Sequence, residues 1–173
     1  MIWITGLAGA GKTTIGREVS GLIQSRKPNT VFLDGEDVRT IMGDDLGFTA
    51  EDRRFNAWRI SRLCHYLDGQ GIDVVCATLS IFPEHQEWNR ENYSRYFEVF
   101  IEVPMDELVA RDKKNLYSRA LRKEITDVVG VDIPHTPPAH PHHVVKNGEP
   151  MRPPTVLAEE IIRALDESFH PRD

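Results

Sequence analysis

The stretch MIWITGLAGAGKTT, residues 1–14, decides the fold of this chain. The apolar run Met1–Thr5 predicts a short buried strand, and Gly6–Thr13 fits the pattern G-x-x-x-x-G-K-[ST]. Apolar residues at helical spacing follow over Thr13–Ser25, and the predicted helix ends before Pro28. A strand, a glycine-rich turn and a helix in this order predict a loop whose backbone N–H groups surround phosphate oxygens at a helix N-terminus.

Two side chains of this loop have defined roles in the motif. Lys12 is expected to reach the β- and γ-phosphates of a nucleotide, and the Thr13 hydroxyl is expected to bind Mg²⁺. ATP and Mg²⁺ are therefore the predicted cofactors. The predicted nucleotide contacts are Gly6, Leu7, Ala8, Gly9, Ala10, Gly11, Lys12 and Thr13, with Thr13 as the metal ligand.

Strands and helices alternate through the rest of the chain. Apolar runs predict strands at residues 30–33, 73–77, 96–103 and 143–146. Helical patterns cover residues 49–70, 83–93, 105–111 and 155–169, and Thr49 followed by Asp52 is a capping pattern. Continuous β-branched strands between helices predict an α/β fold with a parallel sheet covered on both faces. The charged segment 112–127 is predicted to be a mobile lid, and the Pro- and His-rich segment 133–143 an irregular surface loop.

Composition sets the broad class. A length of 173 residues suits one domain, residues 1–173, with a full core. The net charge of −6 argues against nucleic-acid binding, and no apolar run reaches the length of a membrane span. The N-terminus lacks the pattern of a secretion signal, and Cys64 and Cys76 lack metal-binding or redox spacing. We therefore expect a cytoplasmic protein with no nucleic-acid or membrane partner.

Motors, GTPases and small kinases all use this type of phosphate loop. The chain is too short for motor machinery, and it lacks the Asn-Lys-x-Asp motif with which a GTPase reads its base. These exclusions favour a P-loop NTPase fold of the small-kinase type, in which a lid closes over ATP. A nucleotide-binding module without catalysis is the alternative from another class.

Asp34 ends the second predicted strand, where the topology of an open parallel sheet places ligand-binding groups. A carboxylate there can accept a proton from an attacking hydroxyl or order a metal-bound water. The structural alternative is an N-cap for a short helix that starts at Glu36, and one residue can do both.

Arg39, Arg53 and Asn56 are candidates for binding an anionic acceptor, and Phe48 is suited to stack on a base. The alternative for Arg53 is a solvated face of a charged helix.

Five segments together resemble the adenylylsulfate kinase family, collinearly from about Ile2 to Pro141. They are residues 6–14, LDGEDVR at 33–39, DLGFTAEDRRFN at 45–56, RDKKNLYSRA at 111–120 and VVGVDIPHTPP at 128–138. The resemblance implies transfer of the ATP γ-phosphate to the 3′-hydroxyl of adenosine 5′-phosphosulfate. It assigns catalysis to Asp34 and Lys12, adds Thr14 to the ATP loop and starts the lid near Arg111. It also implies Arg39, Phe48, Arg53 and Asn56 at the acceptor, and a homodimer.

The departures from that family lie on the acceptor side. Its Ile-Ser-Pro-Tyr-Arg loop is replaced by a segment that begins with Leu79 and Ser80 and continues to Pro83. Its lid sequence Asp-Pro-Lys-Gly becomes DKKN around Lys114, and Val128 stands where the family has a phenylalanine. We assign Leu79, Ser80, Lys114 and Val128 to the substrate site. Because a pyrimidine needs less stacking surface than adenine, these changes also resemble the cytidine diphosphoramidate kinases of capsule modification, and both acceptors stay open.

Overall fold

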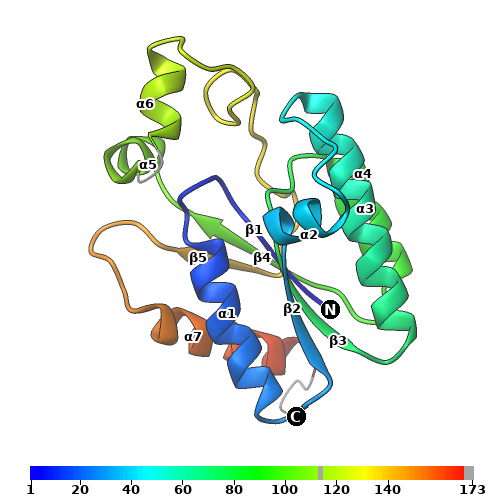
Figure 1. Ribbon diagram of the computed structural model, residues 1–173. Helices are drawn as coiled ribbons and strands as arrows, with labels where there is room; N and C mark the ends of the chain where they lie inside the picture. The colour runs from blue at the N-terminus through cyan, green and yellow to red at the C-terminus, as the bar shows by residue number, and fades with distance from the viewer. Residues whose placement is uncertain (113–114, 170–173) are drawn as a thin grey trace.

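The computed structural model describes residues 1–112 and 115–169, and within them five parallel strands form one sheet of order β2-β3-β1-β4-β5 (Figure 1). The strands are β1 (Ile2–Thr5), β2 (Thr30–Asp34), β3 (Asp73–Ala77), β4 (Phe97–Glu102) and β5 (His143–Lys146). Every neighbouring pair is parallel, which confirms the predicted sheet. The chain leaves β1 toward β2 and β3 on one side and later reaches β4 and β5 on the other. A ligand crevice is therefore expected at the carboxyl end of β1.

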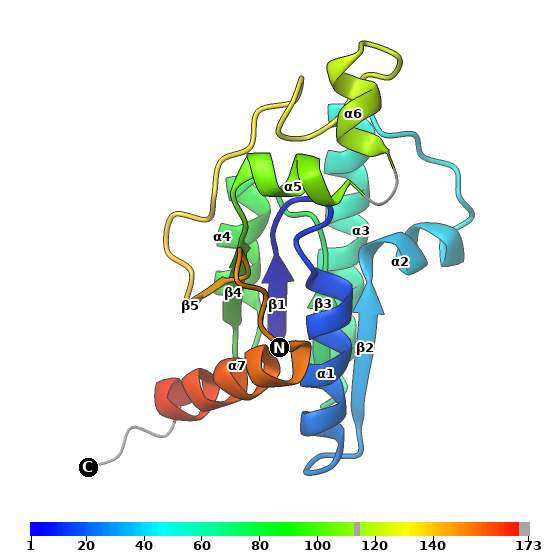
Figure 2. The ribbon, with the colours of Figure 1, turned by 90° about the vertical axis from the view of Figure 1, so that its left-hand side faces the viewer.

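Helices cover both faces of the sheet, as predicted (Figures 1 and 2). One core layer joins the sheet to α1 (Lys12–Gln24), α5 (Met105–Arg111), α6 (Leu116–Leu121) and α7 (Pro154–Phe169). The other joins it to α2 (Gly35–Ile41), α3 (Ala50–Gly69) and α4 (Pro83–Asn92). Figure 2 shows α5 and α6 above the carboxyl end of the strands, where a lid over the crevice belongs.

The capping pattern at the start of α3 is confirmed. The Thr49 hydroxyl accepts a hydrogen bond from the backbone N–H of Asp52 at 3.1 Å, so one of the N–H groups that lack a helical partner is satisfied. None of the helices in the described ranges combines the length and the apolar content that crossing a bilayer requires.

The segment 112–127 is not irregular throughout, because it contains α6. The Asp112 carboxylate accepts hydrogen bonds from the N–H groups of Tyr117 at 3.0 Å and Ser118 at 2.8 Å. Tyr117 and Ala120 are buried in the core. The dense charge of this segment hid a short helix with one apolar side. The helix α2, which the sequence offered only as the structural alternative for Asp34, is present; it begins after Asp34 and buries Val38 completely.

Candidate active site

The phosphate loop has the backbone conformation of an anion-binding turn. Gly9 has φ +78° and Gly11 has φ +98°, a backbone conformation that glycine adopts without a steric cost. The helix α1 begins directly after Gly11, and no side chain caps its first turn. The positive end of the helix dipole and the N–H groups of the loop therefore point toward one place, which suits phosphate oxygens.

Lys12 lies across this loop. Its Nζ atom donates a hydrogen bond to the backbone oxygen of Leu7 at 2.9 Å, so the ammonium group is already next to the turn. A bound phosphate chain offers it charged oxygens, which bind an ammonium group more strongly than a neutral carbonyl does.

Asp34 joins the phosphate loop to the acceptor side. The Thr13 hydroxyl donates to Asp34 Oδ2 at 2.5 Å, and the N–H of Glu36 donates to Asp34 Oδ1 at 2.9 Å. Asp34 thus caps α2, which was the structural alternative, and at the same time places a carboxylate oxygen against the loop. Two hard oxygen donors in contact, one of them a carboxylate, are the ligand types that Mg²⁺ prefers.

Two arginines lie against the ring of Phe48. The guanidinium carbon of Arg39 is 4.8 Å from the ring centroid, and that of Arg53 is 5.4 Å from it. Arg39 is 8% exposed and is held by the carbonyls of Leu46 and Gly47 at 2.9 and 2.6 Å. Burial and the positive charge of Arg39 lower the pKa of Arg53. The positive charges of the two guanidinium groups repel each other, and an anion bound between them would reduce that repulsion.

Arg53 does not lie on a solvated helix face. Its Nε atom donates to the Phe48 carbonyl and its Nη2 atom to the Asp127 carbonyl, both at 2.8 Å. The guanidinium therefore ties α3 to the segment that precedes Val128. Val128 itself is only 3% exposed, and its N–H donates to Asp132 Oδ1 at 2.6 Å. In this structure its side chain belongs to the core, so it presents little surface to a base.

The remaining described residues predicted to bind the acceptor lie on α3 and directly after β3. Asn56 on α3 is buried, and its Oδ1 atom has no hydrogen-bond partner within the described ranges. Ser80 is buried after β3, and its N–H donates to the Thr5 hydroxyl at 3.2 Å. That bond anchors the loop of Leu79 to the end of β1. Asn56 therefore offers an unused acceptor atom for a donor on a ligand.

The start of the predicted lid segment is held close to the end of β5. Arg111 donates to the backbone oxygen of Asn147 at 2.8 Å and to Glu107 Oε2 at 3.2 Å. Thr14, in the first turn of α1, is exposed. Lys114, the other predicted lid residue, lies outside the described residues. Asn147 has no motif around it, and sequence reasoning missed it; its role emerges only from the contacts that it makes with distant segments.

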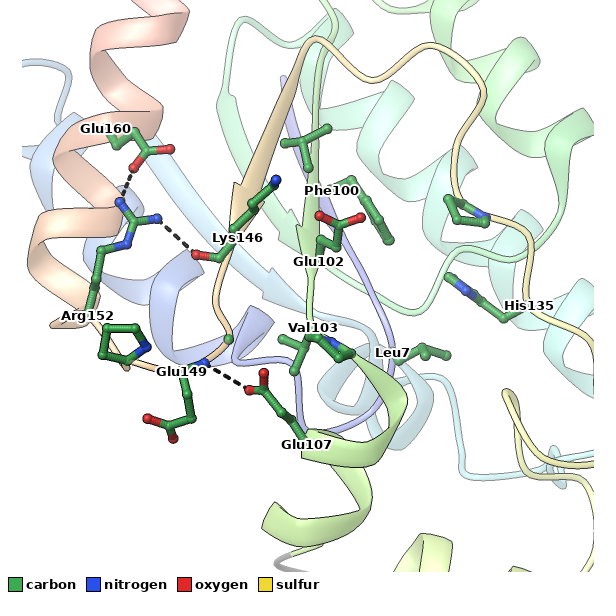
Figure 3. A pocket seen from close by; sticks show the side chains of 15 residues that line it. Leu7, Phe100, Glu102, Val103, Glu107, His135, Lys146, Glu149, Arg152 and Glu160 are labelled. Atoms are coloured by element: carbon green, nitrogen blue, oxygen red, sulfur yellow. Dashed lines mark hydrogen bonds and ion pairs between the residues drawn. The ribbon is translucent and has the colours of Figure 1, made fainter.

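A cavity of about 920 Å³ lies beside the phosphate loop (Figure 3). Its walls include Leu7, Phe100, Glu107, His135 and Lys146. It shares Leu7 with the loop but contains none of the described residues predicted to bind the acceptor. The cavity therefore borders the phosphate loop at Leu7 and does not contain the Thr13–Asp34 pair.

The histidines of segment 133–143 make structural contacts. The His135 ring stacks on Phe100 with centroids 6.0 Å apart, and burial lowers its pKa. The His142 Nδ1 atom accepts a hydrogen bond from the N–H of Glu98 at 3.0 Å. These contacts attach an irregular segment to β4, next to the edge strand β5.

Comparisons with known proteins agree with this geometry. A family described as adenylylsulphate kinase matches residues 1–146. A cytidine diphosphoramidate kinase of Campylobacter jejuni is 41% identical over 133 residues, which are 77% of this chain and 78% of the relative. An adenylyl-sulfate kinase of Chloroflexus aurantiacus is 40% identical over 141 residues, 82% of this chain and 76% of the relative. The structure of the Mycobacterium tuberculosis APS kinase CysC in complex with AMPPNP and APS has a TM-score of 0.84 at 32% identity, covering 95% of this chain and 96% of its own.

Proposed function

The chain belongs to the adenylylsulphate kinase family, and from that premise we propose that it transfers the γ-phosphate of ATP to the 3′-hydroxyl of a nucleotide with an anionic 5′ group. Adenosine 5′-phosphosulfate is the first acceptor that we propose for this reaction. The observation that carries the proposal is the 2.5 Å contact between Thr13 and Asp34, which puts a carboxylate against the phosphate loop.

In the proposed reaction, Asp34 accepts the proton of the acceptor's 3′-hydroxyl as its oxygen bonds to the γ-phosphorus. The bond from the γ-phosphorus to the bridging oxygen breaks, and ADP leaves with that electron pair. Lys12 exchanges the Leu7 carbonyl for phosphate oxygens. Thr13 and Asp34 are the residues that would hold Mg²⁺, which supplies charge neutralisation when bound. Positioning and electrostatics provide most of the acceleration in such transfers.

The arginines on Phe48 hold the acceptor in this proposal. Arg39 and Arg53 take the 5′ anion, and the exposed ring of Phe48 stacks on the base. Asn56 accepts a hydrogen bond through its Oδ1 atom, which has no partner among the described residues. The 3′-hydroxyl then extends toward Asp34. The lid that closes over both substrates is the segment that contains α6.

A second acceptor, cytidine diphosphoramidate, is favoured by one specific observation. The side chain of Val128 is buried in the core, so an aromatic wall opposite Phe48 is missing at that position. A pyrimidine loses less from this than adenine does, since its stacking area is smaller. The Campylobacter jejuni relative named for that activity is 41% identical to the chain.

The test is an ATP-consumption assay with Mg²⁺ that compares adenosine 5′-phosphosulfate with cytidine diphosphoramidate. Turnover of adenosine 5′-phosphosulfate at micromolar concentration supports the first assignment. Turnover of the cytidine nucleotide alone moves the chain to the second acceptor and keeps the reaction. ATP binding without transfer to either nucleotide contradicts the kinase proposal and favours a nucleotide-binding module.

A further inference from the structure

Two buried side chains from distant segments hold the backbone of the phosphate loop. The Tyr117 hydroxyl donates to the carbonyl oxygen of Ala8 at 2.8 Å, and Asn147 Nδ2 donates to that of Ala10 at 2.8 Å. The partners are 109 and 137 positions apart in the chain. Tyr117 is 1% exposed and Asn147 is 6% exposed, so both donor side chains are shielded from bulk water.

The direction of each carbonyl fixes the direction of the next amide. A trans peptide unit is planar, and its C=O and N–H bonds point to opposite sides. With the Ala8 oxygen held toward Tyr117, the N–H of Gly9 points away from Tyr117. The same relation turns the N–H of Gly11 away from Asn147. Alternate residues with positive φ gather such N–H groups into an anion-binding concavity, and Gly9 and Gly11 both have positive φ.

We infer that Tyr117 and Asn147 are positioning residues of the phosphate site, which aim the N–H groups of Gly9 and Gly11 at the phosphates of the bound nucleotide. The inference rests on the part of the proposed function that assigns this loop to ATP, and it does not depend on the acceptor.

The chemistry of both contacts leaves little choice of partner. A backbone oxygen only accepts, so the Asn147 amide must present its NH₂ group to Ala10. A Cβ atom on Gly11 would lie 2.9 Å from Asn147 Nδ2, which shows how closely the amide packs under the loop. Without the Tyr117 hydroxyl, the Ala8 oxygen would lie beside an apolar ring and lose this donor. Loss of the bond would allow the peptide unit to rotate, which also turns the N–H of Gly9.

Both contacts also join the loop to the lid segment. Tyr117 lies on α6, and Arg111, at the end of α5, donates to the backbone oxygen of Asn147 at 2.8 Å. Nucleotide affinity is therefore sensitive to side chains that do not touch the nucleotide.

The test compares Tyr117→Phe with the matched control Tyr93→Phe. The Tyr93 hydroxyl also donates to a backbone carbonyl, that of Ser61 at 3.0 Å, but on the opposite core layer. Dissociation constants are measured by calorimetry for ATP with Mg²⁺ and for inorganic tripolyphosphate, with the thermal unfolding of each variant. We expect Tyr117→Phe to weaken both ligands about 3- to 10-fold, as for the loss of one hydrogen bond, and Tyr93→Phe to bind them as wild type does.

A folded Tyr117→Phe variant with unchanged affinity for both ligands would overturn the inference, as would an equal loss in Tyr93→Phe. Loss of ATP affinity alone, with tripolyphosphate unaffected, would also overturn it, because the effect would then lie at the base.

The second pair is Asn147→Ala and Asn147→Asp. Both remove the donor, and the carboxylate adds repulsion near the phosphates, so Asn147→Asp should bind tripolyphosphate more weakly than Asn147→Ala. Wild-type affinity in Asn147→Asp would contradict the role of the amide. Neither ligand is an acceptor, so failure to phosphorylate a nucleotide would contradict the proposed function and leave this inference standing.

Discussion

The donor side and the acceptor side of this site are built from different material. The donor side, residues Gly6–Thr13, is one continuous turn that presents backbone N–H groups, supported from behind by Tyr117 and Asn147. The acceptor side presents side chains, among them Arg39, Phe48 and Arg53, and Phe48 is 56% exposed.

This difference teaches where specificity resides. In the proposed reaction, backbone groups bind the phosphates that all nucleoside triphosphates share, so a side chain affects them only by holding the loop, as Tyr117 and Asn147 do. Side chains would select the acceptor directly, and single substitutions would alter that selection. The departures of this chain from its family fall on the acceptor side, as such a division predicts. Asp34 belongs to both sides, since it contacts Thr13 and ends the strand next to the acceptor residues.

The largest expected effect follows from breaking the link between the two sides. Asp34→Ala should lower kcat about 10²- to 10⁴-fold, because the acceptor hydroxyl loses its proton acceptor. ATP affinity should change far less than kcat, since the phosphates are bound mainly by backbone groups and Lys12. Steady-state kinetics together with calorimetry of ATP binding measure both quantities. Turnover within a few-fold of wild type would show that Asp34 only caps α2.

Removal of one arginine should affect the acceptor side alone. Arg53→Ala should raise the KM of the acceptor roughly 10- to 100-fold, since a charge-assisted hydrogen bond to the 5′ anion is lost. The KM of ATP should not change. The control is Arg62→Ala on the same helix, where the guanidinium lies 5.6 Å from the Trp58 ring centroid. An unchanged acceptor KM in Arg53→Ala would reduce Arg53 to a tie between α3 and Asp127.

Loss of the stacking ring should have a smaller effect. Phe48→Ala should raise the acceptor KM about fivefold or more, corresponding to about 1 kcal/mol of stacking. Phe48→Leu keeps apolar surface without a π face, so its acceptor KM should lie between those of the wild type and Phe48→Ala. Initial rates with both candidate acceptors would measure this, and the larger change should occur with the adenine nucleotide. Equal KM values in all three proteins would remove Phe48 from the site.

The stability of the protein should also depend on pH, because α4 buries His85. His85 is fully buried beside Trp58 and Phe82, and burial, with the Arg54 charge, lowers its pKa to about 4. Between that value and the ordinary pKa of about 6.5, the unfolded chain binds a proton that the folded chain does not. The free energy of unfolding should therefore fall as pH decreases from about 6.5 to about 4.

The steepest slope of this effect is about 1.4 kcal/mol per pH unit. His85→Phe should flatten the decline, because its ring takes no proton. Denaturant titrations of both proteins at several pH values measure the slopes. Identical slopes would show that His85 does not cause the decline in stability.

The sequence predicted the strand, turn and helix of the phosphate loop because their geometry is local. A glycine-rich turn between a strand and a helix is read from consecutive residues, and the structure forms that turn at the end of β1. The alternation of strands and helices likewise predicted the parallel sheet, with strand bounds such as Asp73–Ala77 reproduced.

What the sequence did not predict depends on contacts between distant segments. Tyr117 and Asn147 reach the phosphate loop across more than a hundred residues, and no spacing pattern encodes such a meeting. The helix α6 was not predicted, because charged residues flank it and only Tyr117 and Ala120 of its six residues are buried. The burial of Val128 depends on the core layer around it, which alignment with a motif does not reveal.

The most direct test of the central claim is the position of the new phosphate. The purified chain is incubated with ATP, Mg²⁺ and the nucleotide that it turns over, and the product is examined by ³¹P NMR. The account predicts a new phosphomonoester signal coupled to the 3′ proton of the ribose, with ADP formed in equal amount. Phosphate on the 5′ group, or release of inorganic phosphate without a modified nucleotide, would contradict the meeting of donor and acceptor at Asp34.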